Sequence, residues 1–204
     1  MQNEWLKKYA GVLLTTATLR DELAHYESPH DKRASLVKSG ELIRLKQGCY
    51  CVSPKASGVA LDQGAIANQL YGPSYLSLEM ALAHYELIPE AVMGMTSVVT
   101  GRSKRYITPI GWFTYQNIPE SLFGLGVRTE NGHLIASPEK ALCDYLYTRS
   151  NLRITSPKTL ASYLEEDVRF DFDEFKDYDR SVFSAFAASG YKTGLFKAAE
   201  RLFA

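Results

Sequence analysis

Residues 28–53, SPHDKRASLVKSGELIRLKQGCYCVS, decide how the N-terminal part of this chain is expected to fold. Ser28 is a candidate N-cap, and Pro29 follows at the first helical position, where its missing N–H costs nothing. Gly40 stands where the C-cap of that helix is expected. Residues 42–52 then alternate at a period of two, turn at a Gln-Gly pair and return. The stretch therefore predicts a basic helix followed by a basic hairpin.

The basic side chains of this stretch suit a DNA duplex. A helix of this kind fills the major groove, while the hairpin, as a wing, follows neighbouring phosphates. We expect His30, Lys32 and Arg33, near the start of the helix, to reach base edges, and Arg33 to suit guanine. Phosphate contacts are expected from other basic and hydroxyl side chains, which are Lys38, Arg44, Lys46, Ser28 and Thr16. The alternative is an ordinary solvated helix and hairpin, because surface lysine and arginine are common.

Two helical segments precede the basic helix. The first is a short amphipathic segment within residues 3–13, and the second begins at Thr15 or Thr16, either of which can cap it. Helix, helix, turn, helix and hairpin is the order of a winged helix-turn-helix. We therefore predict a DNA-binding domain over residues 1–54, followed by a short linker over 54–58.

A second domain is predicted over residues 59–204, and the chain as a whole is expected to be α+β. This second domain combines helices with strands in an α/β arrangement and ends in a helical bundle. Ser137-Pro138-Glu139 is the clearest helix start in the chain. Helices are predicted at 62–71, 77–85, 157–165, 173–177, 179–189 and 192–203. Strands are predicted at 97–100, 105–108 and 111–117, and as a hairpin of 125–128 and 133–136 around an Asn-Gly turn.

Composition is that of an ordinary soluble globular protein, with 46% hydrophobic residues, 23% charged residues and a formal net charge of zero. Residues 1–60 nevertheless carry nine lysines and arginines against six acidic residues, which favours a nucleic-acid-facing N-terminal part. The three cysteines have no paired framework, and no signal peptide or membrane span is read. We expect a cytoplasmic protein with no membrane partner.

Catalytic and metal-binding motifs find no support. A nuclease wants an acidic-x-Lys pair on a strand, but Glu139 and Lys140 are adjacent at a helix start. With Asp144, they are interpreted as dipole compensation and exposed polarity. Cys49 and Cys51 lack two further zinc ligands, and no phosphate-binding loop or serine elbow is present. His84 is interpreted as a packed or capping residue, and the acidic, aromatic stretch at 165–179 as packing. We expect no enzyme, no cofactor and no metal.

Several segments together resemble the AbiEi family, the antitoxins and transcriptional regulators of type IV, abortive-infection toxin–antitoxin systems. They are a winged helix with a G-x-Y pattern at Gly48 and Tyr50, SYLSLEMALAHYELI, TSVVTGRSKRYITPIGWFTYQNI and HLIASPEKALCDYLY. The resemblance covers roughly residues 10–150. It implies an N-terminal domain that binds inverted repeats in the operon's own promoter and represses it. It also implies a second domain that counters a nucleotidyltransferase-like toxin without forming a stable complex.

Two points remain open from the sequence. A second basic group, Arg102, Lys104 and Arg105, is either a solvated turn or part of the surface needed for antitoxicity. The alternative to an antitoxin is a winged-helix regulator whose second domain binds a ligand or dimerises. Repressors of this kind often act as dimers on palindromes, so cooperative or dimeric binding is the expectation on an inverted repeat.

Overall fold

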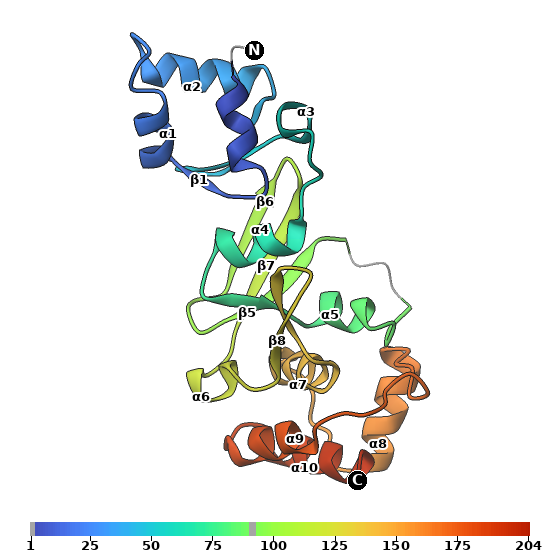
Figure 1. Ribbon diagram of the computed structural model, residues 1–204. Coiled ribbons are helices and arrows are strands. Elements are labelled where there is room, and N and C mark those ends of the chain that lie inside the picture. The colour runs from blue at the N-terminus through green and yellow to red at the C-terminus, as the bar shows by residue number, and fades with distance from the viewer. Residues whose placement is uncertain (1–2, 90–92) are drawn as a thin grey trace.

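The computed structural model describes residues 3–89 and 93–204. The fold is mixed α+β, with a three-stranded sheet near the N-terminus and a six-stranded sheet in the second part of the chain. The molecule is elongated: the N-terminal unit lies at one end, the larger sheet in the middle, and the last helices at the other end (Figure 1). Within the described ranges, none of the helices combines the length and the apolar character that a membrane crossing requires.

The N-terminal unit has the three predicted helical segments and the hairpin, with an additional short strand between the first two helical segments. It consists of η1 (Glu4–Tyr9), β1 (Leu14–Thr15), α1 (Thr16–Glu22), α2 (Pro29–Lys38), β2 (Leu42–Lys46) and β3 (Cys49–Val52). Thr15 caps α1, because its hydroxyl accepts a hydrogen bond from the Thr18 N–H at 3.1 Å. Gly40 has a φ of +74° and ends α2, as predicted, with its N–H donating to the Val37 carbonyl.

The three-stranded sheet has the order β1-β3-β2, and its central strand β3 is buried on both faces. Alternate residues of β3 belong to different cores: Tyr50 and Val52 pack with the N-terminal leucines, whereas Cys49 and Cys51 pack into the core of the second part. Leu45 of β2 also packs into that second core. The hairpin predicted as a projecting wing is therefore the joint between the two parts of the molecule.

A short helix forms where the sequence predicted a linker, and it packs on η1 of the N-terminal unit. Pro54 occupies the first turn of this helix and Gly58, with a φ of +75°, ends it. Within the described residues, three further helices and six strands follow, and the C-terminal helices come last. In chain order they are α3 (Pro54–Ser57), α4 (Gln63–Leu70), β4 (Ser74–Leu76), α5 (Glu79–His84), β5 (Met95–Val99), β6 (Lys104–Thr108), β7 (Gly111–Asn117), α6 (Glu120–Phe123), β8 (Val127–Glu130), β9 (His133–Ala136), α7 (Pro138–Thr148), α8 (Pro157–Ser162), the π-helical turn η2 (Tyr163–Asp167), α9 (Arg180–Ala188) and α10 (Thr193–Leu202).

The larger sheet has the strand order β6-β7-β5-β4-β9-β8, with β5 parallel to β7 and β4 parallel to β9. Tyr115 of β7 reaches α4 on one face, where its hydroxyl donates to the Ala67 carbonyl at 2.7 Å. Tyr75 of β4 reaches α7 on the opposite face, where its hydroxyl donates to Asp144 at 2.9 Å. The sheet is thus a layer between α4 and α7, and α9 packs on α7 from the far side (Figure 1).

β1, β4 and α6 were not predicted, and two predicted helices differ from the structure. The helix expected at 77–85 begins only at Glu79, because Leu78 takes a φ of +60° directly after β4. No helix forms at 173–177. Instead, the Asp171 carboxylate accepts hydrogen bonds from the N–H groups of Asp173 and Glu174 and turns the chain. The aromatic residues of this stretch do pack as predicted, on Phe203.

The interpretation of the α7 start as exposed polarity is wrong. Glu139 is only 4% exposed, and Lys140 and Asp144 are fully buried. The Lys140 ammonium lies 2.5 Å from one oxygen of Asp144, whose other oxygen accepts hydrogen bonds from Tyr75 and Ser77. Burial raises the pKa of Asp144, while the neighbouring ammonium and these hydrogen bonds oppose that rise. The pair is a satisfied ionic network inside the core.

Candidate nucleic-acid interface

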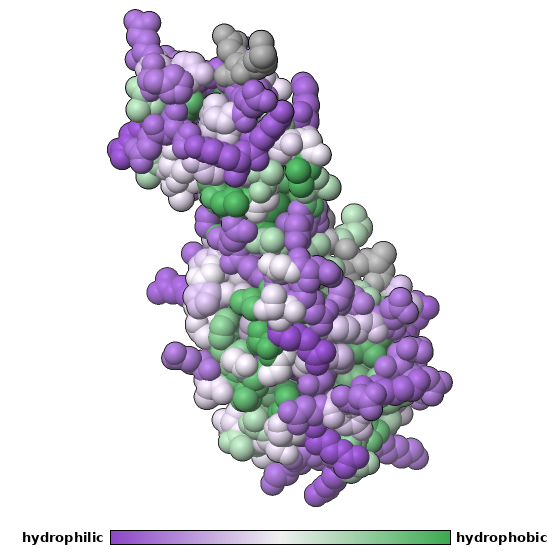
Figure 2. Space-filling model, viewed as in Figure 1, coloured by the Kyte–Doolittle hydropathy of each residue, from purple (hydrophilic) through white to green (hydrophobic). Residues whose placement is uncertain are grey.

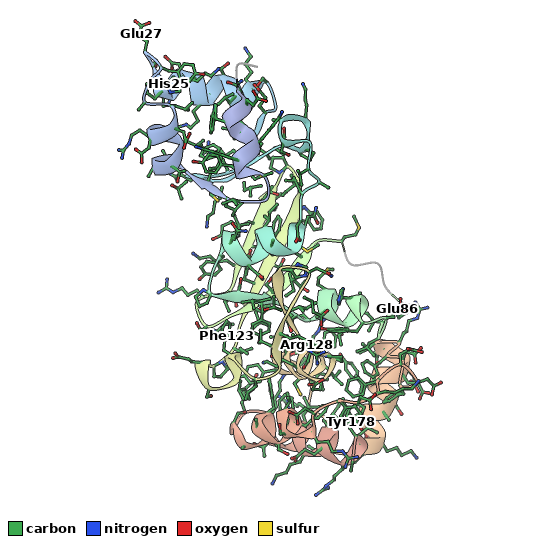
Figure 3. All side chains as sticks on the ribbon, in the orientation of Figure 1. His25, Glu27, Glu86, Phe123, Arg128 and Tyr178 are labelled. Carbon is green, nitrogen blue, oxygen red and sulfur yellow. The ribbon has the colours of Figure 1, made fainter. Side chains whose placement is uncertain are left out.

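A hollow of about 310 Å³ lies between α1 and α2 at the outer end of the molecule. Leu19 and Leu23 of α1 are buried beneath it. Its complete lining is Thr16, Leu19, Arg20, Leu23, Pro29, His30 and Arg33. The loop between the two helices lies at the tip farthest from the C-terminal helices, and Glu27 projects outward from it (Figure 3). The second part of the chain therefore leaves this surface open.

Arg33 and Arg44 are both neighbours of Tyr50. The Arg33 guanidinium lies 5.8 Å from the centre of the Tyr50 ring, and Arg44 is the cross-strand partner of Tyr50. Cross-strand partners project from the same face of a sheet, so Arg44 projects from the same side of the hairpin as Tyr50, which is the side of α2. Within the described residues, neither arginine forms an ion pair, and both charges are therefore available to an anionic ligand.

Thr16 lies beside the hairpin turn. Its N–H donates to the Gly48 carbonyl at 3.1 Å, and its hydroxyl oxygen is 3.6 Å from where a Cβ on Gly48 would stand. Arg20 follows one helical turn later on the same face of α1 and also lines the hollow. The sequence analysis missed Arg20, although its spacing of four from Thr16 was the signal. Its contact with Asp21 is 3.7 Å long and exposed, which leaves it weakly held.

The structure separates Lys32 from the other predicted groove contacts. Residues two apart on an α-helix point about 200° apart, so Lys32 faces away from His30. The Lys32 ammonium lies over the Tyr26 ring at 4.8 Å instead. The expected trio is therefore reduced to His30 and Arg33, which line the hollow together. Lys38 remains exposed in the last turn of α2.

Ser28 occupies the N-cap position of α2 without capping it. Its hydroxyl donates to the Asp31 carboxylate at 2.7 Å, and the His30 Nδ1 atom lies 3.4 Å from the other oxygen. The hydrogen bond from Ser28, and then that with His30, hold the pKa of Asp31 below its usual value. The Ser28 proton is therefore engaged within the protein, and its predicted role as a donor to phosphate is withdrawn.

Lys46 is engaged in the joint between the two parts. Its ammonium donates to the Leu70 carbonyl at the end of α4 and lies 5.0 Å from the centre of the Tyr106 ring on β6. Carbonyls at a helix C-terminus lack helical partners, so a lysine is a suitable ligand there. We therefore no longer count Lys46 among the phosphate contacts.

The second basic group does not form one surface. Lys104 and Arg105 are neighbours on β6, so their side chains leave opposite faces of the sheet. The Lys104 ammonium lies over the Tyr71 ring at 4.4 Å, and the Arg105 guanidinium lies over the Trp112 ring at 4.7 Å. Arg102 is exposed in the preceding turn. Any function of this group has to be assigned face by face.

Other reactive side chains are engaged in packing or pairing. Cys49, Cys51 and Cys143 are free and buried, and burial raises the pKa of Cys51 to about 11. His84, interpreted from the sequence as a packed or capping residue, is exposed and pairs with Glu130 at 3.0 Å. Across the described part of the chain, no group of three or more His, Cys, Asp or Glu residues could hold a metal ion.

Comparison of the sequence with protein-family models gave no match, and comparison with curated proteins gave none either. The surface of the N-terminal unit is largely hydrophilic, except where it meets the second part (Figure 2). The hollow between α1 and α2 combines an apolar floor with the Arg33 guanidinium, which forms no ion pair among the described residues.

Proposed function

We propose that the chain is a DNA-binding transcriptional autorepressor whose N-terminal unit reads double-stranded DNA as a winged helix-turn-helix. The observation that supports this most strongly is the placement of Arg33 and Arg44 around Tyr50, beside the hollow between α1 and α2. Two cations from different elements thus lie near Tyr50, and Arg33 also lines the hollow. The order of the helices and the strand order β1-β3-β2 agree with the same proposal.

In this proposal α2 enters the major groove. The Tyr50 ring supports one face of the Arg33 guanidinium, which leaves its N–H edge for a bidentate contact to guanine O6 and N7. Arg20, Lys38 and Arg44 contact phosphates, with the Thr16 hydroxyl as a neutral donor. Three such ionic contacts give a log–log salt slope of roughly −3 for each bound copy. On an inverted repeat, two copies bind with cooperative or dimeric geometry.

The autorepressor is also proposed to be an antitoxin of a type IV, abortive-infection toxin–antitoxin system. What supports this half is the resemblance of roughly residues 10–150 to AbiEi proteins, which extends over both parts of the chain. In such a system the second part counteracts a nucleotidyltransferase-like toxin without a stable complex, and the chain itself is not an enzyme and needs no cofactor. The proposal places the protein in the cytoplasm.

A direct test uses the gene's own upstream DNA and its neighbour. Purified full-length protein is expected to shift the upstream fragment in a gel and to protect an inverted repeat from nuclease. Co-expression is expected to restore growth to cells that express an adjoining nucleotidyltransferase-like gene. Failure of the first experiment removes the repressor, and failure of the second removes the antitoxin.

A second candidate is favoured by a polar hollow of about 170 Å³ in the second part, between α5, α7 and the sheet. Its lining is Leu78, Glu79, Thr96, Thr114, Gln116, Thr148 and Arg149. A winged-helix regulator whose second part binds a small polar ligand there is the alternative to an antitoxin. Growth that stays arrested in the co-expression experiment, together with DNA binding that changes with a metabolite, would favour this alternative.

A further inference from the structure

The second part of the molecule carries an uncovered sheet face that the proposed function does not use. We define this platform as Arg105 and Ile107 of β6 with Trp112, Thr114 and Gln116 of β7. Arg105 pairs with Thr114 and Ile107 pairs with Trp112 across the two antiparallel strands, so these side chains share one face. Ile107 is 72% exposed and Trp112 is 45% exposed. Neighbouring large apolar side chains that are exposed to solvent on a sheet face often mark a binding surface.

The platform combines three chemistries in a row. Trp112 offers an exposed indole, and the Arg105 guanidinium lies over that ring at 4.7 Å. Thr114 and Gln116 come next along β7, at steps of about 6.8 Å, and both also line the polar hollow beside α5 and α7. A ring for stacking is thus followed by hydrogen-bonding groups and a recess.

Charge decides what kind of ligand this arrangement suits. Arg102 and Arg105 are exposed, and neither forms an ion pair within the described residues. A protein partner needs a broad apolar centre, and this platform contributes only Ile107 and Trp112. A polymer that alternates flat bases with phosphates matches an indole beside guanidinium groups that form no ion pair among the described residues.

We propose that the platform binds a single-stranded polynucleotide, with one unpaired base stacked on Trp112 and a neighbouring phosphate held by Arg105. The polar recess beside Thr114 and Gln116 accepts the edge of the next base. Exposed sheet faces with aromatic side chains bind unpaired bases in this manner, because every base has a flat face. The inference concerns a different surface from the α1–α2 hollow and does not rest on duplex binding there.

The experiment uses the tryptophan of the platform as a reporter. The chain has two tryptophans, so Trp5→Phe leaves Trp112 as the sole indole. The full chain carrying Trp5→Phe and Arg33→Glu, which removes the proposed duplex contact, is titrated with twelve-nucleotide oligo-U, oligo-dT and a duplex. Single strands are expected to quench the Trp112 emission and the duplex is not. Quenching by either oligo-U or oligo-dT supports the proposal. The strand that quenches more strongly shows whether RNA or DNA is preferred.

A second measurement keeps the test independent of Trp5→Phe. Fluorescence anisotropy of a labelled single strand with the wild-type chain is compared with Arg105→Ala, Trp112→Ala and Lys104→Ala. We expect roughly tenfold weaker binding for Arg105→Ala and Trp112→Ala. Lys104→Ala, which removes an equal charge from the opposite face of the same strand, is expected to bind within about twofold of wild type. Absence of single-strand binding, equal quenching by the duplex, or equal losses from Lys104→Ala and Arg105→Ala would overturn the inference.

Discussion

The Lys46 ammonium donates its hydrogen bond to the Leu70 carbonyl, and this contact joins β2 to the end of α4. The same ammonium faces the Tyr106 ring on β6. The hairpin after α2 is consequently held on one side by the second part of the molecule, with Cys49 and Cys51 buried in that part's core. In the proposed function, a duplex bound to α2 would meet the remaining side of the hairpin, where Arg44 is the cross-strand partner of Tyr50.

Replacing Lys46 with methionine tests this joint. The change keeps the length of the side chain but removes the donor, so the Leu70 carbonyl loses its charged partner. We expect the free energy of unfolding to fall by about 1.5–3 kcal/mol, measured by urea denaturation. The salt slope of DNA binding is expected to stay unchanged. A slope that falls by one with unaltered stability would instead make Lys46 a phosphate contact.

Replacing Arg44 with alanine is the matched change on the open side of the hairpin. This arginine is exposed and unpaired within the described residues, so stability is expected to change little. Binding to DNA is expected to weaken on all sequences alike, with the log–log salt slope reduced by about one. The measurement is a set of titrations from low to moderate salt. An unaltered slope would remove Arg44 from the interface.

Replacing Lys140 with methionine leaves Asp144 buried without its ion-pair partner. Both side chains are fully buried, and such a loss typically costs about 3–5 kcal/mol of the free energy of unfolding. Urea denaturation gives the free energy of unfolding of this variant and of the double variant Lys140→Met with Asp144→Leu. The first variant keeps a buried carboxyl without its partner, and the second replaces both groups with apolar side chains. The double variant is expected to be the more stable of the two. A single variant as stable as wild type would contradict the buried ionic network.

The contact of Glu22 with η1 predicts a pH dependence of the N-terminal unit. Hydrogen bonds from Lys8, and then from Tyr9, hold the pKa of Glu22 below its usual value of 4.5. A carboxyl with a lower pKa in the folded state stabilises the fold above its unfolded pKa, and this contribution is lost as pH falls through the folded value. Stability is therefore expected to decrease on acidification below about pH 4.5.

Thermal unfolding is measured at neutral and at acidic pH, and the loss of stability between the two pH values measures the contribution of Glu22. Glu22→Gln is expected to show a smaller loss on acidification than wild type. Glu27→Gln is the control, because the Glu27 side chain projects outward from the α1–α2 loop (Figure 3). Identical pH profiles for Glu22→Gln and wild type would show that the Lys8–Glu22 contact does not stabilise the fold.

Local signals predicted much of the fold correctly. The basic helix, the following hairpin and the α7 start were all marked by residues that act within their own segment, such as Pro29, Gly40 and Ser137. β4 was missed because its three residues are too few to show an alternation, and because their burial is decided by β5 and β9 on either side. Tertiary pairing, rather than local preference, makes that strand.

The candidate site was less predictable for the same reason. A list of basic residues does not reveal which of them turn toward another part of the chain. Lys46 looks like Arg44 in the sequence, yet α4 and β6 engage one and leave the other exposed. Lys32 and Arg33 are adjacent, but helical geometry directs them to different neighbours. Helical spacing alone could have separated these two before the structure was known.

The different orientations of Lys32 and Arg33 give the most direct test of the central claim, which is that the surface around the α1–α2 hollow binds DNA. Gel-shift titrations on the gene's own upstream fragment compare wild type with Arg33→Glu and Lys32→Glu, which make the same charge change on adjacent residues. Circular dichroism checks that both variants are folded. We predict that Arg33→Glu abolishes the shift, while Lys32→Glu retains binding within about tenfold of wild type. Equal loss in both variants, or an undiminished shift with Arg33→Glu, would contradict the account.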